Sequence, residues 1–190
     1  IRGKMGDPSW IAILEDHDII CFQETWDQRK EGMTRDGFAS FAVPAIKSTA
    51  GRARGGLFTM VALSLPCDIE PLNLKSSNLS MVRLIFGNSK LMVANIYNSR
   101  HDKNSISTLA ELHVVLTRLR EEERDDVPVV ILGDFNIHPC TLCPPPKSFH
   151  SELAGPIFHF EHYTHGDSLF ELLGEFNLVN AAEEVDTEGD

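Results

Sequence analysis

The sequence predicts one α/β domain over residues 1–190, in which some strands pair antiparallel as hairpins. Short apolar runs at residues 69–74, 81–86 and 91–97 are typical of strands, and Gly87-Asn88-Ser89 joins the last two as a turn. The clearest helix is predicted over residues 105–124, where leucines recur at spacings of three and four. Neither a repeat nor a linker divides the chain. We therefore expect a sheet that is not purely parallel.

The remaining elements follow from local patterns. Asp7 is a predicted N-cap for a helix that begins at the following proline. Residues 18–22 read as a short buried strand, and paired glycines precede a longer apolar strand at residues 57–65. Apolar side chains at helical spacing predict a second helix over residues 166–176, and residues 177–180 are expected to start another strand.

Composition narrows the class of protein. A hydrophobic content of 42% and a net charge of −11 are compatible with a globular domain but argue against a broadly basic nucleic-acid-binding surface. The acids concentrate at residues 121–126 and 183–190, so a local basic rim remains possible. Four cysteines do not indicate a disulfide framework, which favours a reducing, intracellular compartment. Apolar runs fall short of the roughly 18 residues of a membrane span, so no membrane association is expected.

The segment at residues 127–139, VPVVILGDFNIHP, is the strongest candidate for a site. Its β-branched run predicts a strand buried on both faces, and Gly133 permits a turn or a close backbone approach at its end. Alternation along a strand would place Asp134 and Asn136 on one side and Phe135 in the core. A carboxylate and an amide there can orient a water and contact an anion. A simple turn is the alternative.

Other polar side chains also follow predicted strands. Glu24 comes directly after the strand at residues 18–22, and Tyr97 and Asn98 end the strand at residues 91–97. Tyr97 can donate its hydroxyl to an anion. The alternatives are a solvated loop acid for Glu24 and a packing role for Tyr97.

A polar loop, residues 47–54, carries Lys47, Arg52 and Arg54. These cations could contact a substrate phosphate, or they could simply keep a surface loop soluble.

Cys140 and Cys143 form a C-x-x-C pair, with His138 before it and His150 after it. A zinc site is not favoured, because only one ligand pair has a recognisable spacing. A proline-rich loop that carries two thiols is the better explanation.

Four segments, DIICFQET, GGLFTMVAL, LMVANIYN and VVILGDFNIHP, together resemble the endonuclease/exonuclease/phosphatase superfamily in order and approximate spacing. The likeness is greatest to the endonuclease domains encoded by non-LTR retrotransposons, where a helix resembling SLFELLGEFNLVNA follows the GDFN element. The resemblance implies a DNase I-like, four-layered α/β sandwich with two mixed sheets and outer helices, here incomplete at both termini.

The resemblance also implies roles for individual residues. Glu24 would be a ligand of Mg²⁺, for which Mn²⁺ is a possible substitute, and Asp134 would orient or deprotonate the attacking water. Asn136 and Tyr97 would hold the scissile phosphate, with Asn98 as a neighbouring contact.

The implied function is metal-dependent cleavage of a phosphodiester by the DNA-nicking domain of a retrotransposon-type protein. DNA would be the substrate, a reverse transcriptase domain the covalent neighbour, and the nucleus the place of action. Two alternatives remain: a non-catalytic interaction remnant of such a domain, and a phosphatase of the same superfamily that acts on a phosphoinositide or a nucleotide.

The family's first-strand Asn and its closing Ser-Asp-His are not found, and the chain starts at Ile1, so a segment of a longer product is expected. We therefore predict that the 190-residue chain nicks DNA poorly or not at all. Supercoiled plasmid and Mg²⁺ would be incubated with this chain and with a version extended at both ends. Equal nicking by the two would contradict the prediction.

Overall fold

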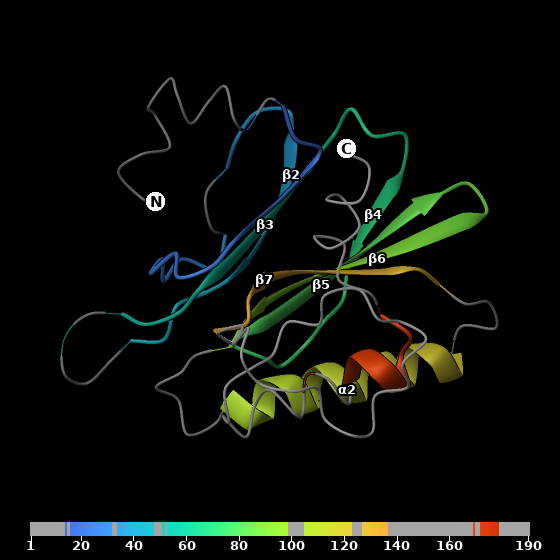
Figure 1. The fold of residues 1–190 in the computed structure, drawn as a ribbon. Coiled ribbons are helices and arrows are strands. Elements are labelled where there is room, and N and C mark those ends of the chain that lie inside the picture. Colours follow the sequence, from blue (N-terminus) through green and yellow to red (C-terminus); the bar gives the residue numbers. More distant parts are fainter. Residues whose placement is uncertain are drawn as a thin grey trace, which may run out of the picture. The chain divides into compact units, whose positions relative to one another are not determined.

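The computed structural model describes residues 14, 16–31, 34–47, 51, 53–98, 105–122, 127–136, 169 and 172–178. The chain forms two compact units, Ile1–Phe135 and Asn136–Asp190. The expectation of a single domain over residues 1–190 stays a prediction. The first unit contains two sheets and the long helix (Figure 1).

The first sheet is antiparallel and has the strand order β1-β3-β2. Its strands are β1 (Ile19–Phe22), β2 (Phe38–Val43) and β3 (Leu57–Ala62). β1 and β3 confirm the strands predicted at residues 18–22 and 57–65, although β3 ends three residues early. β2 was not predicted, because its sequence, FASFAV, does not alternate apolar and polar residues, and all six residues are half-buried in the structure.

The second sheet is mixed and has the order β4-β5-β6-β7. β4 (Asp68–Pro71), β5 (Leu79–Phe86) and β6 (Ser89–Tyr97) pair antiparallel, whereas β7 (Val129–Asp134) lies parallel to β6. The predicted hairpin between β5 and β6 is confirmed, and antiparallel pairing does occur. The first of the three predicted strands is shorter than expected, since β4 ends at Pro71.

Helix α2 (Ser105–Glu122) connects β6 to β7 and packs against the second sheet (Figure 1). A parallel strand pair needs such a crossover, because two parallel strands cannot be joined by a tight turn. The predicted leucine stripe forms the buried face of this helix, at Leu109, Leu112, Leu116 and Leu119.

Apolar side chains fill the space between the two sheets. Val61 of the first sheet packs with Val82, Leu84 and Val93 of the second, and all four are buried. Cys21 joins this cluster, and burial raises the pKa of its thiol to about 11. The thiol is therefore protonated at neutral pH and is a poor nucleophile or metal ligand.

A second cluster lies on the other face of the first sheet. Leu14, Phe22, Phe58 and Met60 are buried there, and the rings of Phe22 and Phe58 stack with centroids 6.3 Å apart. Leu14 is helical, in the region where the sequence predicts the N-terminal helix. Its neighbours in that predicted helix lie outside the described residues.

A polar contact runs through the apolar space between the sheets. Asn95 on β6 is fully buried, and its Nδ2 lies 3.3 Å from the carbonyl oxygens of Phe22 and Phe58 and 3.1 Å from Thr59 Oγ1. Its Oδ1 accepts a hydrogen bond of 2.8 Å from Gln23 Nε2. One side chain of the second sheet therefore binds three neighbouring positions of the first sheet.

β7 differs from the prediction of a strand buried on both faces. Val130 and Leu132 are 40% and 37% exposed, because β7 is the edge strand and only β6 pairs with it among the described strands. The uninterrupted apolar run did not distinguish an edge strand from a central one. The close approach predicted at Gly133 is confirmed, since a Cβ there would lie 2.0 Å from the carbonyl oxygen of Ile96.

The second unit is described over a short helical segment. Leu169 and residues 172–175 are helical, as predicted for residues 166–176. Asn177 has a φ of +52°, and the Leu178 N–H donates to the Leu173 carbonyl at 2.9 Å, which is the geometry of a helix C-cap. Asn177 and Leu178 are not in a strand, so the strand predicted at residues 177–180 is wrong at its first two positions. Within the described part of the chain, no helix is long and apolar enough to cross a membrane.

We predict that Asn95→Leu lowers the free energy of unfolding by about 2–3 kcal/mol, because it leaves buried polar groups without their partner. Ser80→Ala is the control, since Ser80 Oγ makes one shared hydrogen bond of 3.3 Å with Thr59 across the same space. It should cost about 1 kcal/mol. Urea unfolding would measure both variants, and equal small losses would show that Asn95 does not join the sheets.

Candidate active site

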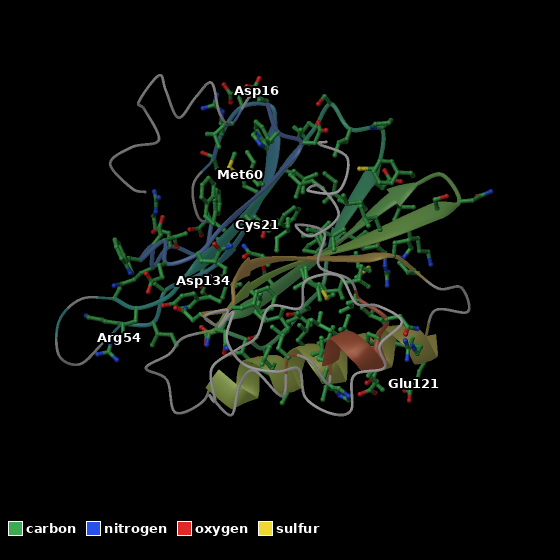
Figure 2. All side chains as sticks on the ribbon, viewed as in Figure 1. Asp16, Cys21, Arg54, Met60, Glu121 and Asp134 are labelled. Atoms are coloured by element: carbon green, nitrogen blue, oxygen red, sulfur yellow. The ribbon has the colours of Figure 1, made fainter. Side chains whose placement is uncertain are left out.

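Three predicted site residues meet at one edge of the first unit. The Tyr97 hydroxyl donates a hydrogen bond to Glu24 Oε1, and Tyr97 is the register partner of Asp134 in the parallel β6–β7 pair. Parallel strands have their carboxyl ends at the same edge of a sheet. Asp134 (Figure 2), at the end of β7, therefore lies beside Tyr97, at the end of β6. Glu24 and Asp134 are exposed and Tyr97 is half-buried, so two carboxylates and a phenol can reach a ligand from solvent.

The loop that carries Glu24 has an unusual backbone. Glu24 and Trp26 have φ values of +50° and +53°, which non-glycine residues rarely adopt. Backbone bonds hold the loop against the segment before β3: the N–H of Thr25 donates to Gly56 at 3.1 Å and that of Trp26 to Gly55 at 3.0 Å. This conformation turns Glu24 towards Tyr97 of the other sheet.

A glycine is required at position 56, where the loop that carries Glu24 crosses the segment that leads into β3. Gly56 has a φ of +89°, and a Cβ there would lie 2.5 Å from Thr25 Oγ1 and 3.2 Å from the backbone nitrogen of Ala45. Gly55 has a similar φ of +69°, but a Cβ there would meet only Asn78 Oδ1, at 3.8 Å. The first glycine thus permits the turn, and the second also leaves room for Thr25.

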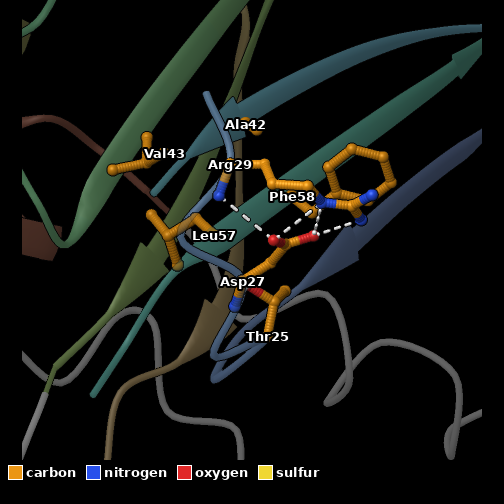
Figure 3. Close-up of a pocket in the computed structure, with 7 residues that line it drawn as sticks. All are labelled: Thr25, Asp27, Arg29, Ala42, Val43, Leu57 and Phe58. Atoms are coloured by element: carbon orange, nitrogen blue, oxygen red, sulfur yellow. Dashed lines mark hydrogen bonds and ion pairs between the residues drawn. The ribbon is translucent and has the colours of Figure 1, made fainter. Parts of the chain in front are cut away.

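An ion pair closes the other end of this loop (Figure 3). Asp27 is 6% exposed and accepts from Arg29 through Nε, at 3.0 Å to each oxygen, and through Nη2 at 2.6 Å. The bond to Asp27 raises the pKa of Arg29 further, so the guanidinium stays charged. Asp27 also accepts from the Arg29 N–H at 3.1 Å, and its carbonyl accepts from Ala45 at 2.7 Å.

These contacts give the Asp27–Arg29 pair a role in shaping the loop. The small hollow beside it is lined mainly by Thr25, Ala42, Val43, Leu57 and Phe58, and not by Glu24, Tyr97 or Asp134. Sequence reasoning missed Asp27 and Arg29. The only local signal was an acid and a base two residues apart, which is common on surfaces.

Asn98 holds the end of β7 in place. Its backbone N–H donates to the Asp134 carbonyl at 2.8 Å, and its Nδ2 donates to the Phe135 carbonyl at 3.0 Å. Asn98 is only 2% exposed, and its Oδ1 is buried without a partner among the described residues. Its contacts therefore position Asp134, while a direct contact of Asn98 with phosphate stays a prediction.

The remaining predicted site residues are Asn136, Arg54 and Arg52. β7 ends at Asp134 and Asn136 has a φ of +51°, so strand alternation does not extend to Asn136 and no longer predicts its direction. Asn136 belongs to the second unit, and its role at the phosphate stays a prediction. Arg54 is exposed and pairs with Ile46 through two backbone bonds of 3.0 Å. Arg52 lies outside the described residues.

The donor set suits a hard divalent cation. Mg²⁺ prefers oxygen ligands, and carboxylates supply them here at Glu24 and Asp134. Across the described ranges, no three His, Cys, Asp or Glu side chains cluster as a ready-made metal cage. Mg²⁺ is usually bound by one or two carboxylates together with substrate oxygens and water. Cys140 and Cys143 lie outside the described residues.

We predict that Gly56→Ala lowers the free energy of unfolding by about 2 kcal/mol more than Gly55→Ala. Both variants carry the strain of a positive φ, about 1–2 kcal/mol, but only alanine at position 56 collides with Thr25 and Ala45. Denaturant titration of the two variants would test this. Equal destabilisation would mean that the loop yields without cost at Thr25.

Comparison with known proteins agrees with this architecture. The profile of the Endonuclease/Exonuclease/phosphatase family matches residues 8–146. A sequence comparison with curated proteins finds no significant match.

Several solved structures share the fold. The endonuclease domain of TRAS1, a telomere-specific non-LTR retrotransposon, has a TM-score of 0.50 at 16% identity, with 87% of this chain and 62% of that one covered. An AP endonuclease from Archaeoglobus fulgidus has a TM-score of 0.50 at 19% identity, with 90% and 64% covered. The 3'-5' exonuclease NExo from Neisseria meningitidis has a TM-score of 0.51 at 17% identity, with 89% and 65% covered.

At such low sequence identity, the structural similarity shows the fold alone. It confirms the predicted α/β sandwich class. The chain spans less than two thirds of the length of each of these proteins. The family profile, by contrast, covers most of the chain. The chain therefore belongs to the endonuclease/exonuclease/phosphatase family, whose members are hydrolytic nucleases and phosphatases.

Proposed function

We propose that this chain is the metal-dependent, DNA-nicking endonuclease domain of a retrotransposon-type protein. The observation that carries the proposal is the hydrogen bond from Tyr97 to Glu24, which joins the ends of two different sheets at one point beside Asp134. Residues from three strand ends come together there although they are far apart in the sequence. Such convergence at a sheet edge is typical of a catalytic site.

Each residue has a distinct task in the proposed reaction. Asp134 accepts a proton from a water, whose oxygen attacks the phosphorus while the bond to the leaving oxygen breaks. Tyr97 donates a hydrogen bond to the phosphate and holds it for in-line attack. Glu24 is the proposed ligand of Mg²⁺, which would supply positive charge to offset the negative charge of the phosphoryl oxygens. The leaving oxygen takes a proton from solvent.

The Tyr97 hydroxyl must change partner in this scheme. A phenol has one proton to donate, and in this structure Tyr97 donates it to Glu24. With phosphate bound, the same proton is available to a phosphate oxygen only when Glu24 is no longer its acceptor. Binding of phosphate by Tyr97 therefore requires that its hydrogen bond to Glu24 is broken.

DNA is the proposed substrate and a reverse transcriptase domain the proposed covalent neighbour. The net charge of −11 limits phosphate contacts to local cations, and exposed Lys47 and Arg54 belong to such a local group. The proposal also includes that the protein acts on DNA in the nucleus. A non-catalytic remnant and a phosphatase of the same family are the competing outcomes of the test below.

We predict that Glu24→Gln or Asp134→Asn reduces Mg²⁺-dependent nicking of supercoiled plasmid by at least about 100-fold, the usual effect of losing a principal electrostatic or proton-transfer group. Glu111→Gln, which changes an exposed acid on α2, is the matched control and should leave nicking unchanged. The measurement is the initial rate of nicked-circle formation with Mg²⁺ and with EDTA.

The assay would use the chain extended at both ends and, in parallel, the 190-residue chain. Nicking that survives Glu24→Gln would place the chemistry elsewhere. Failure to nick while soluble phosphoinositides or nucleotides are hydrolysed would favour the phosphatase. Turnover of neither kind of substrate would favour the non-catalytic remnant.

A further inference from the structure

Trp26 is an exposed aromatic residue beside the candidate site. It lies two residues after Glu24, is 38% exposed and has a φ of +53°. A bulky side chain at positive φ is a conformational outlier, and such strain collects at functional sites. Here the bond from the Trp26 N–H to the Gly55 carbonyl, at 3.0 Å, maintains it.

Backbone hydrogen bonds bring three segments side by side around Trp26. Trp26 binds Gly55, Asp27 accepts from Ala45 at 2.7 Å, and Ile46 pairs with Arg54 through two bonds of 3.0 Å. The segments at residues 26–27, 45–47 and 54–55 therefore form one continuous patch of the first unit.

The exposed side chains on this patch are of two kinds. Trp26 and Ile46, which is 59% exposed, are apolar, whereas Lys47 and Arg54 carry positive charge. We call Trp26, Ile46, Lys47 and Arg54 the Trp26 rim. The net charge of the chain is −11, and two exposed cations lie on the segments that pair with the Trp26 loop.

We propose that the Trp26 rim binds an unpaired stretch of DNA next to the scissile phosphate, with Trp26 stacking on a nucleobase and Arg54 and Lys47 contacting the flanking phosphates. This inference rests on the proposed function, because it takes the strand cut at Glu24 and Asp134 to be the strand bound. Aromatic faces combined with cations are how proteins bind single strands without reading their sequence. A base inside a duplex does not offer its face to an indole, so the rim selects unpaired or opened DNA.

A purely apolar protein partner fits this patch less well. The cations lie on the same segments as the apolar side chains, and burying them against a protein without acidic partners would cost free energy. A DNA strand supplies phosphates and bases at a regular repeat, which matches both kinds of side chain.

Binding is tested in EDTA, so that no cleavage occurs, with fluorescently labelled oligo(dT) and an abasic oligonucleotide of the same length. Trp26→Asn should weaken oligo(dT) binding about tenfold and leave abasic binding unchanged, because only bases stack. Asparagine accepts a positive φ, so the backbone is expected to persist. Arg54→Ala should weaken binding of both oligonucleotides by the same factor, because phosphates are common to both.

A second readout is the fluorescence of Trp26 itself. The chain has two tryptophans, so Trp10→Phe leaves Trp26 as the only source of tryptophan emission. Oligo(dT) should quench this emission and the abasic strand should not. Trp26→Phe, which keeps an aromatic ring, should bind oligo(dT) between the wild type and Trp26→Asn, and thermal melting would check that each variant is folded.

The proposal is overturned if wild type binds both strands equally, or if Trp26→Asn leaves the preference for oligo(dT) intact. An unfolded Trp26→Asn protein would move the decision to Trp26→Phe and to the quenching measurement. The preference for oligo(dT) is measured without nicking. A protein that nicks DNA but shows no such preference would therefore refute only the proposed role of the Trp26 rim. Loss of nicking with the preference retained would refute the endonuclease alone.

Discussion

The buried amide of Asn95 is the contact on which the site depends. It reaches from β6 to β1 and β3 through the apolar space between the sheets, and no solvent is available there to replace a lost partner. The amide therefore favours one alignment of the two sheets. Gln23, which binds the same amide at 2.8 Å, immediately precedes Glu24, and Tyr97 lies two residues beyond Asn95. The buried contact between Gln23 and Asn95 and the Glu24–Tyr97 contact at the edge are thus close together along both chain segments.

Close backbone packing sets the positions of the two carboxylates. Asp134 follows Gly133, where β7 approaches Ile96 so closely that a Cβ would lie 2.0 Å from its carbonyl oxygen. Glu24 sits in a loop with positive φ that crosses Gly56. Both arrangements cost conformational free energy locally, and the surrounding hydrogen bonds from Asn98 and Thr25 maintain them. Rigid backbone around exposed carboxylates is what orienting a water or a cation requires.

The distribution of charge bears on how an acidic chain would face the proposed anionic substrate. The two carboxylates at the site would repel phosphate by themselves, and a bound divalent cation would offset their charge. Asp27 does not add to this repulsion, because Arg29 neutralises it within the loop. Arg54 and Lys47 then contribute net positive charge on segments that pair with the Trp26 loop. Local pairing, and not the total charge of −11, decides what the edge can bind.

Local periodicity alone determined the elements that depend on neighbouring residues: the leucine face of α2, the β5–β6 hairpin, and the short apolar strands β1 and β3. It also placed Glu24, Tyr97 and Asp134 at strand ends. Only the tertiary structure decided what depends on long-range pairing. It placed unpredicted β2 beside β3, put β7 at the edge of the described sheet with Val130 and Leu132 exposed, and joined Asn95 to Thr59. The physical reason is that strand order and contacts between sheets join residues distant in the chain, and no local pattern of side chains encodes which strand becomes the neighbour.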